Sequence, residues 1–417
     1  MSRSLLLKSL LFVSGLTLLL WHRILNLSFL GESAVYFQSE YVKFIQDGFS
    51  HFWNRHDVFA LLFFYFLGNI LKDSMSAYHF LLFVMTVLVN YSVYLLVQKL
   101  TTSHKAAVFS TILFVANYNG SFELLGTGFN YPTFLQRVVT LPIVLISFYL
   151  LHNGRFILPL ILYTSALFLA HFNLVLLPLF LIYIFISFFP KFIKSAVHSL
   201  PYVGISYLLI KNQTITGASS IYWSTLFQDV LHVFNLVTWP KAVILCLFLA
   251  FAARNRLNLS VFLSFPAVVF VLLYLNRSAF VYGFDSNRYF YVPSLLVSIF
   301  LGLSFTRFIE SSRMLWLVIL TFLTFWVVHN SRLINHGFDE YQEANTLVRE
   351  VVTKVKKQYP VLPQTPTLIV LDRRVGKYNA DLLNRFHGGA TLYFASKETP
   401  EYDSIIHNVY YTPRPLN

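Results

Sequence analysis

Residues 76–97 read "SAYHFLLFVMTVLVNYSVYLLV" and hold no charged side chain. An α-helix rises about 1.5 Å per residue, so roughly 17 to 25 apolar residues cross the hydrocarbon core of a bilayer. This stretch is long enough and apolar enough to do so. It therefore predicts a membrane-spanning helix.

The composition of the whole chain agrees with this stretch. Of the 417 residues, 56% are apolar and 12% are charged, whereas soluble domains carry about 25% charged residues. The net charge of +13 is typical of Lys and Arg side chains that anchor the cytoplasmic loops of a membrane protein. We therefore expect a lipid bilayer, and no nucleic acid, as a partner. The single cysteine, Cys246, excludes a disulfide framework.

Similar apolar runs recur along the chain and predict an all-α polytopic membrane protein with about eleven spans. The N-terminal run resembles a signal peptide, but bulky residues follow it where a cleavage site would need small ones, so we expect an uncleaved first span. The predicted spans lie near residues 5–22, 77–98, 105–118, 137–152, 156–170, 172–189, 195–211, 240–253, 257–275, 289–306 and 314–330.

The basic residues between these runs predict the orientation, because cytoplasmic loops are enriched in Lys and Arg. With the N-terminus in the cytoplasm, every inner segment is short and basic, and the longer outer loops hold most of the acids. The apolar stretch 58–71 would invert this pattern as a span, so we expect an interfacial helix within a large first outer loop, 23–76. The inner segments hold Arg3, Lys8, Lys99, Lys105, Arg155, Lys191, Lys194, Arg254, Arg256, Arg307 and Arg313.

The composition changes near residue 331, and residues 331–417 predict a small extracytoplasmic α/β region after the membrane domain 1–330. The stretch "DEYQEANTLVREVVTKVKKQYP" has charged and apolar residues on opposite helical faces, so it predicts an amphipathic helix. The stretches "TPTLIVLD" and "GATLYFAS" are flanked by Pro and Gly and predict short strands. An odd number of spans places this C-terminal region outside.

Two outer loops hold groups that could carry chemistry. Glu32 lies just after the first span, where partial desolvation can raise the pKa of a carboxyl group or let it position a hydroxyl, although a solvated loop acid has the same appearance. The loop 117–137 holds Glu123 and ends at Arg137. Arg137 either anchors the start of the fourth span or binds a lipid phosphate, which guanidinium recognises bidentately.

Further polar residues stand at two other outer turns. His171 and Asn173 lie in a tight turn between two short spans, where a lone histidine is more often a hydrogen-bonded turn residue than a ligand. Asp285 and Arg288 precede the tenth span, and Tyr289 and Tyr291 fit an interfacial aromatic belt. Arg288 either pairs with Asp285 or binds a phosphate, and its outward position favours the phosphate. The spans lack the buried acids of ion-coupled transporters, and the chain has no nucleotide-binding, GxSxG or HExxH motif.

The layout over residues 5–330 resembles the GT-C superfamily of integral membrane glycosyltransferases, and in particular its O-mannosyltransferase-like members. "FLGES" with Glu32 stands where these enzymes have an acid at the start of a large first outer loop. The stretches 58–71 and 76–97 are similar to their interfacial helix and second span. "NRYFYVPSLL" resembles their RY-x-Y-x-P-S stretch, which is carried here by Arg288, Tyr289, Tyr291, Pro293 and Ser294.

The resemblance implies a polyprenyl-phosphate-linked sugar as donor and the hydroxyl of a glycan, lipid or protein as acceptor. Glu32 would be the general base, and Arg288 with Arg137 would bind the leaving phosphate. Glu123, His171, Asp285 and the two tyrosines would support them. The chain departs from the family where Gly31 stands in place of a second acid and Phe172 follows His171. We therefore assign no metal ligand, and whether a divalent cation (Mg²⁺ or Mn²⁺) takes part stays open.

Three other functions fit part of the pattern: a non-enzymatic polyprenyl-lipid transporter or flippase, a polysaccharide polymerase or ligase, and a degenerate family member kept as an assembly partner. A polymerase would place its key groups in a large late outer loop, whereas here the large loop is the first. Length and cysteine poverty favour a prokaryotic plasma membrane and the cell envelope, with the endoplasmic reticulum as the alternative location.

Overall fold

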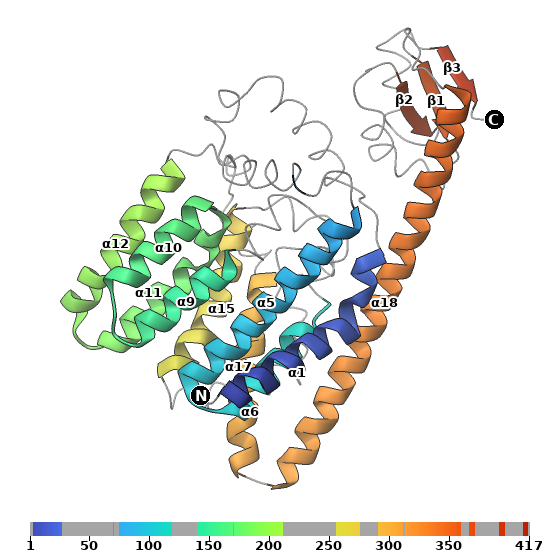
Figure 1. The fold of residues 1–417 in the computed structure, drawn as a ribbon. Helices are drawn as coiled ribbons and strands as arrows, with labels where there is room; N and C mark the ends of the chain where they lie inside the picture. Colours follow the sequence, from blue (N-terminus) through green and yellow to red (C-terminus); the bar gives the residue numbers. More distant parts are fainter. Residues whose placement is uncertain are drawn as a thin grey trace, which may run out of the picture. The chain divides into compact units, whose positions relative to one another are not determined.

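The computed structural model describes residues 3–26, 70, 75–118, 140–169, 171–211, 256–275, 291–311, 313–359, 367–371, 392–396 and 412–415. This part of the chain is almost entirely helical, with one small sheet near its C-terminal end (Figure 1). The helices are α1 (Arg3–Trp21), η1 (His22–Asn26), α5 (Met75–Thr101), α6 (His104–Val115), α9 (Leu141–His152), α10 (Ile157–Leu169), η5 (His171–Leu176), α11 (Leu177–Phe188), α12 (Phe192–Lys211), α15 (Arg256–Leu275), α17 (Tyr291–Ser311) and α18 (Arg313–Gln358).

Ten of the eleven apolar runs fall on described helices, and the run at 240–253 lies outside the described residues, as does nearly all of the stretch 58–71. By length and composition, three described helices could cross a membrane: Ser4–Leu25, His79–Thr101 and Leu315–Glu340. The other apolar helices are shorter. The chain thus has the composition and helicity of an all-α membrane protein, and the number of eleven spans stays a prediction.

Tertiary contacts divide the chain into two compact units. The first unit comprises Met1–His22, Leu82–Leu124 and Pro132–Ile334, and the second comprises Arg23–Leu81, Leu125–Tyr131 and Asn335–Asn417. The predicted division at residue 330 stays a prediction.

Polar side chains join α1 to α5 and α6 within the first unit. Asn90 Nδ2 donates a hydrogen bond to Thr17 Oγ1 at 3.0 Å, and both side chains are buried. Trp21, which is 1% exposed, donates from Nε1 to Val115 O at 2.9 Å. Interhelical hydrogen bonds of this kind hold membrane helices together, since lipid tails remove the hydrophobic drive for helix association.

The short helices α9, α10, α11 and α12 run in alternating directions (Figure 1). At one end of this group, Asn173 Nδ2 donates to Thr140 Oγ1 and to Ala166 O, both at 2.8 Å, which ties η5 to the start of α9 and the end of α10. At the other end, Tyr183 OH and His152 Nδ1 are 2.9 Å apart, so the ends of α9 and α11 lie together. The turn that holds Arg155, between α9 and α10, and the turn that holds Lys191, between α11 and α12, therefore lie at the same end of this group.

The long helix α18 differs from the sequence-based expectation. We expected a span at 314–330 followed by a separate amphipathic helix, whereas α18 continues unbroken to Gln358. The physical reason is that no proline interrupts the sequence from Arg313 to Tyr359, and the apolar residues keep the helical period through residue 331. One helix therefore carries both the apolar and the amphipathic segments.

The C-terminal sheet has three parallel strands in the order β2-β1-β3. β1 (Thr367–Leu371) and β2 (Leu392–Ser396) are the two predicted strands, and β1 occupies the centre with Ile369 fully buried. β3 (Thr412–Pro415) was not predicted, because its sequence "TPRP" holds two prolines. Proline cannot donate to a ladder, but an edge strand tolerates it.

Candidate functional site

Most of the predicted site residues lie outside the part of the chain that the structure describes. Their assignments therefore stay predictions from sequence. The residues concerned are Glu32, Glu123, Arg137, Asp285, Arg288 and Tyr289, and the described ones are His171 and Tyr291.

Tyr291 is a buried anchor at the start of α17. It is 1% exposed, and its ring centroid lies 5.2 Å from that of Phe114 in α6. Ser294 Oγ donates to Tyr291 O at 2.8 Å, and Pro293 stands in the first helical turn, where its missing N–H costs nothing. The ring of Tyr291 packs against α6, and its expected place in an interfacial aromatic belt stays a prediction. The later half of the motif thus serves to hold the helix start.

His171 is the first residue of η5, and Asn173, two residues later, has a structural role. Asn173 is 4% exposed, and its amide joins two helices as described above. The buried amide satisfies polar groups at a helix junction, where an unpaired group would be costly. Asn173 therefore has a structural role in this turn, and the interpretation of His171 itself stays a prediction.

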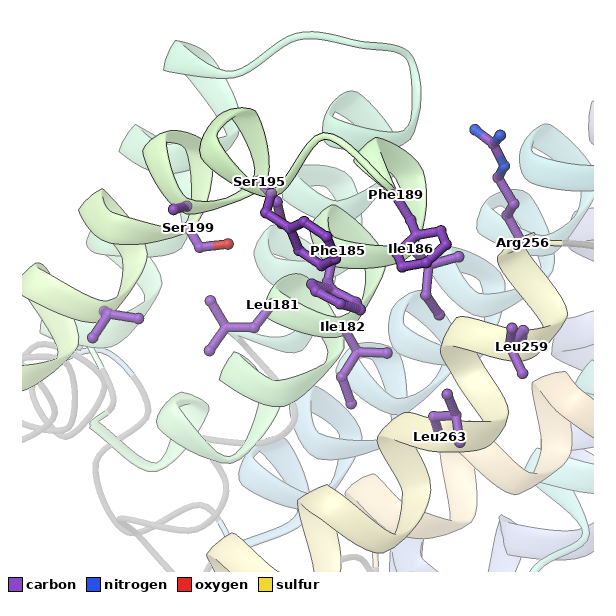
Figure 2. A pocket seen from close by; sticks show the side chains of 13 residues that line it. Leu181, Ile182, Phe185, Ile186, Phe189, Ser195, Ser199, Arg256, Leu259 and Leu263 are labelled. Atoms are coloured by element: carbon purple, nitrogen blue, oxygen red, sulfur yellow. The ribbon is translucent and has the colours of Figure 1, made fainter.

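An apolar groove that the sequence did not predict lies between α11, α12 and α15 (Figure 2). It has a volume of about 870 Å³, within the range of roughly 300–1,000 Å³ typical of small-molecule sites. Its polar lining consists of Ser195 and Ser199 from α12 and Arg256 from α15. The apolar lining includes Leu181, Phe185, Phe189, Phe192, Leu259 and Leu263.

Three phenylalanines form a cluster in the wall of this groove. The centroids of Phe185 and Phe189 are 6.0 Å apart, and that of Phe192 lies 5.9 Å and 5.6 Å from the two. Phe189 and Phe192 are each 59% exposed. Rings this open to the surroundings, next to other apolar side chains, make the groove accessible from outside the helix bundle.

Arg256 lies at the end of the groove where the basic turns meet. Its Nη1 donates to Ser187 O, near the end of α11, at 3.2 Å. Lys194 Nζ lies 4.7 Å from the ring centroid of Phe188, and the Phe156 ring beside Arg155 lies 4.1 Å from that of His198. Three predicted cytoplasmic segments, far apart in sequence, thus bring positive charge to one end.

Sequence reasoning assigned these basic residues only to loops and missed the groove. The signal that could have found it is "FISFFPKFIK", residues 185–194, in which four phenylalanines and two lysines surround a proline. Aromatic and basic side chains together are typical of the headgroup level of a bilayer. Their convergence with Arg256, more than sixty residues later, depends on the tertiary packing.

Comparisons with protein-family models, with curated proteins and with solved structures find no match to this chain. Among the described residues, no group of three His, Cys, Asp or Glu side chains is arranged to hold a metal ion.

Proposed function

We propose that this chain is an integral membrane glycosyltransferase that moves a sugar from a polyprenyl-phosphate donor to an acceptor hydroxyl on the extracytoplasmic side. The observation that carries the proposal is the stretch from Arg288 to Ser294, which resembles the RY-x-Y-x-P-S stretch of the GT-C glycosyltransferases. Its last residues, from Tyr291 on, open α17.

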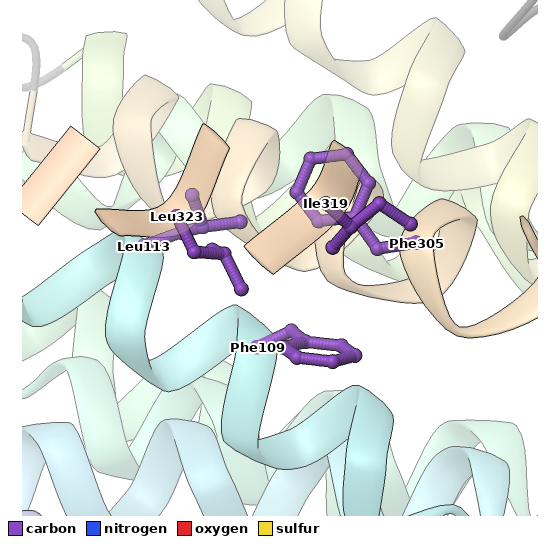
Figure 3. Packing of buried hydrophobic residues seen from close by; sticks show 5 residues of the cluster. All are labelled: Phe109, Leu113, Phe305, Ile319 and Leu323. Atoms are coloured by element: carbon purple, nitrogen blue, oxygen red, sulfur yellow. The ribbon is translucent and has the colours of Figure 1, made fainter. Parts of the chain in front are cut away.

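The packing of α17 supports a positioning role for the motif. Phe109 and Leu113 from α6, Phe305 from α17, and Ile319 and Leu323 from α18 form one buried cluster (Figure 3). Trp326 Nε1 donates to Leu113 O at 3.3 Å beside it. A helix held on two sides in this way is a rigid element, and catalytic groups are positioned better by rigid elements than by isolated loops.

The proposed reaction is a direct displacement at the anomeric carbon of the sugar. Glu32 takes the proton of the acceptor hydroxyl as the new carbon–oxygen bond forms. The bond from the anomeric carbon to the phosphate oxygen breaks, and the polyprenyl phosphate leaves with the electron pair. Arg288 and Arg137 stabilise the charge that grows on this phosphate. Glu123, His171, Asp285 and Tyr289 are proposed to orient the substrates.

A second function, lipid handling without sugar transfer, is favoured by the groove between α11, α12 and α15. Its apolar walls and single guanidinium suit a lipid with a charged headgroup. A transporter of this kind would keep its function when Glu32 is replaced, because a general base has no part in moving a lipid. Glu32 therefore discriminates the two functions.

The test is sugar transfer by the purified protein from a panel of polyprenyl-phosphate sugars. We expect Glu32→Gln to lower the rate by about 10²–10⁴-fold, the usual contribution of general acid–base catalysis. Arg288→Ala should lower it by about 10²–10³-fold, as for removal of a donor that stabilises transition-state charge. The matched controls are Glu343→Gln and Arg155→Ala, whose side chains are exposed. Full activity in both Glu32→Gln and Arg288→Ala would refute the mechanism.

A further inference from the structure

We propose that the groove between α11, α12 and α15 binds one anionic phospholipid of the surrounding bilayer. One acyl chain lies along the apolar walls, and the phosphate is held by Arg256. None of the residues that line this groove belongs to the proposed sugar-transfer site, and the inference does not rest on the proposed function. It concerns the end of the helix bundle where the basic turns meet, which the sequence predicts to be cytoplasmic.

The walls of the groove suit an acyl chain. Apart from Ser195, Ser199 and Arg256, every lining side chain is apolar. Several of them are open to the surroundings, with Phe185 46% and Leu263 40% exposed. In a bilayer this surface is covered by lipid, because water is absent from the hydrocarbon core. The volume of about 870 Å³ accommodates a flexible chain lying along it.

Apolar contact alone would not select one lipid from another. Lipid tails are as apolar as leucine, so moving a tail from the bilayer into the groove gains little free energy. Any preference must therefore come from the headgroup end. The selectivity of the site therefore depends on Arg256.

Arg256 has the chemistry and the free donors to hold a phosphate. Guanidinium carries five N–H donors in a fork that matches phosphate geometry. Among the described residues, Arg256 donates one hydrogen bond, to Ser187 O, and pairs with no carboxylate. This bond fixes the side chain beside the end of α11 while most of its donors stay available.

Neighbouring charge favours an anionic headgroup over a zwitterionic one. Lys194 lies over the Phe188 ring, and Lys191 stands in the turn after Phe189; both side chains are exposed. Each basic residue near the surface of an anionic leaflet contributes about 1 kcal/mol of attraction, and basic pockets between membrane helices bind lipid phosphates. A lipid whose phosphate carries uncompensated negative charge is therefore preferred, for example phosphatidylglycerol.

The experiment counts lipids bound to the purified full chain in detergent. The protein is titrated with palmitoyl-oleoyl phosphatidylglycerol or with phosphatidylcholine of the same chains, and bound lipid is measured by native mass spectrometry. We expect one phosphatidylglycerol to bind at least about tenfold more tightly than phosphatidylcholine. Arg256→Ala should remove this preference, a loss of about tenfold, in line with a charged hydrogen bond. Arg155→Ala, at the same end but outside the groove, should reduce the preference less, because Arg155 adds only to the surrounding charge.

A second pair of variants tests the groove itself. Ala196→Trp fills the groove and should abolish binding of both lipids, whereas Val197→Trp, on the exposed face of the same helix, should not. If Arg256→Ala does not yield a monodisperse protein, Arg256→Gln replaces it. If Ala196→Trp does not, Ser199→Leu replaces it. The proposal is overturned if the two lipids bind equally, if Arg155→Ala weakens binding as much as Arg256→Ala, or if both tryptophan variants behave alike.

Discussion

A single glycine sets how closely α6 and α17 approach each other. A Cβ atom added at Gly302 would lie 2.7 Å from Ser110 N and 2.9 Å from Ser110 Cα, and closer still to Ser110 Oγ. Real side chains do not tolerate such distances to backbone atoms, so any larger residue must push the helices apart. Small residues at helix contacts serve the same purpose throughout membrane proteins.

Gly302→Ala should therefore destabilise the protein. Overpacking of this kind costs about 1–3 kcal/mol. The matched control is Gly204→Ala in α12, where an added Cβ meets nothing within 4 Å, and where replacing a helical glycine should be neutral or stabilising by up to about 1 kcal/mol. The midpoint of thermal unfolding in detergent measures both. Equal midpoints for the two variants would show that the close contact is absent.

At the scale of elements, the second unit holds η1 against the part of α18 that follows the apolar segment. Arg23 Nη2 donates to Asp339 Oδ1 at 2.8 Å and to Gln342 Oε1 at 3.2 Å, and Nη1 donates to Asn335 O at 3.1 Å. Its guanidinium carbon lies 5.4 Å from the ring centroid of the buried Phe338. One side chain thus makes four contacts with about two turns of helix.

Arg23→Ala should loosen this joint more than loss of its ion pair does. Asp339 is 68% exposed, and exposed ion pairs contribute at most about 1 kcal/mol. Asp339→Asn also keeps an oxygen acceptor, so its effect should be small. Amide hydrogen exchange over residues 335–342 is the measurement, and we expect it to accelerate by about tenfold in Arg23→Ala alone. Comparable acceleration in Asp339→Asn would mean that the charge pair is the main contact.

At the scale of the whole molecule, the alternating short helices separate two kinds of turn, which lie at opposite ends of these helices. The turn at His171 closes one end of α9, α10 and α11, and the basic turns at Arg155 and Lys191 close the other. If the basic end is cytoplasmic, as the excess of Lys and Arg predicts, the catalytic groups proposed on outer loops and the lipid site proposed at Arg256 face opposite leaflets.

Labelling of single cysteines tests this arrangement. In a background with Cys246 replaced by serine, Arg155→Cys and Lys191→Cys should react with a membrane-impermeant maleimide only after the cells are permeabilised. His171→Cys should react in intact cells, because it lies at the other end. Reaction of positions 155 and 191 from opposite sides would contradict the helix directions, and reaction of both in intact cells would invert the predicted orientation.

Most of the helices were predictable from local sequence. Backbone groups cannot hydrogen-bond to lipid, so an apolar run of sufficient length must form a helix, and its position can be read from composition alone. The same holds for β1 and β2, which are short runs rich in apolar and aromatic residues between Gly and Pro. β3 and the continuity of α18 were missed because neighbouring strands and a shared helical period override the local signals of proline and charge.

The sequence by itself determined which segments are helical, which residues are charged and where the basic loops fall along the chain. The tertiary structure alone decided that Gly302 meets Ser110, that Tyr291 is buried against Phe114, and that Arg256 stands at the mouth of an apolar groove. The reason is physical: helix formation depends on hydrogen bonds within one segment, whereas a close contact or a groove depends on how side chains from distant segments pack.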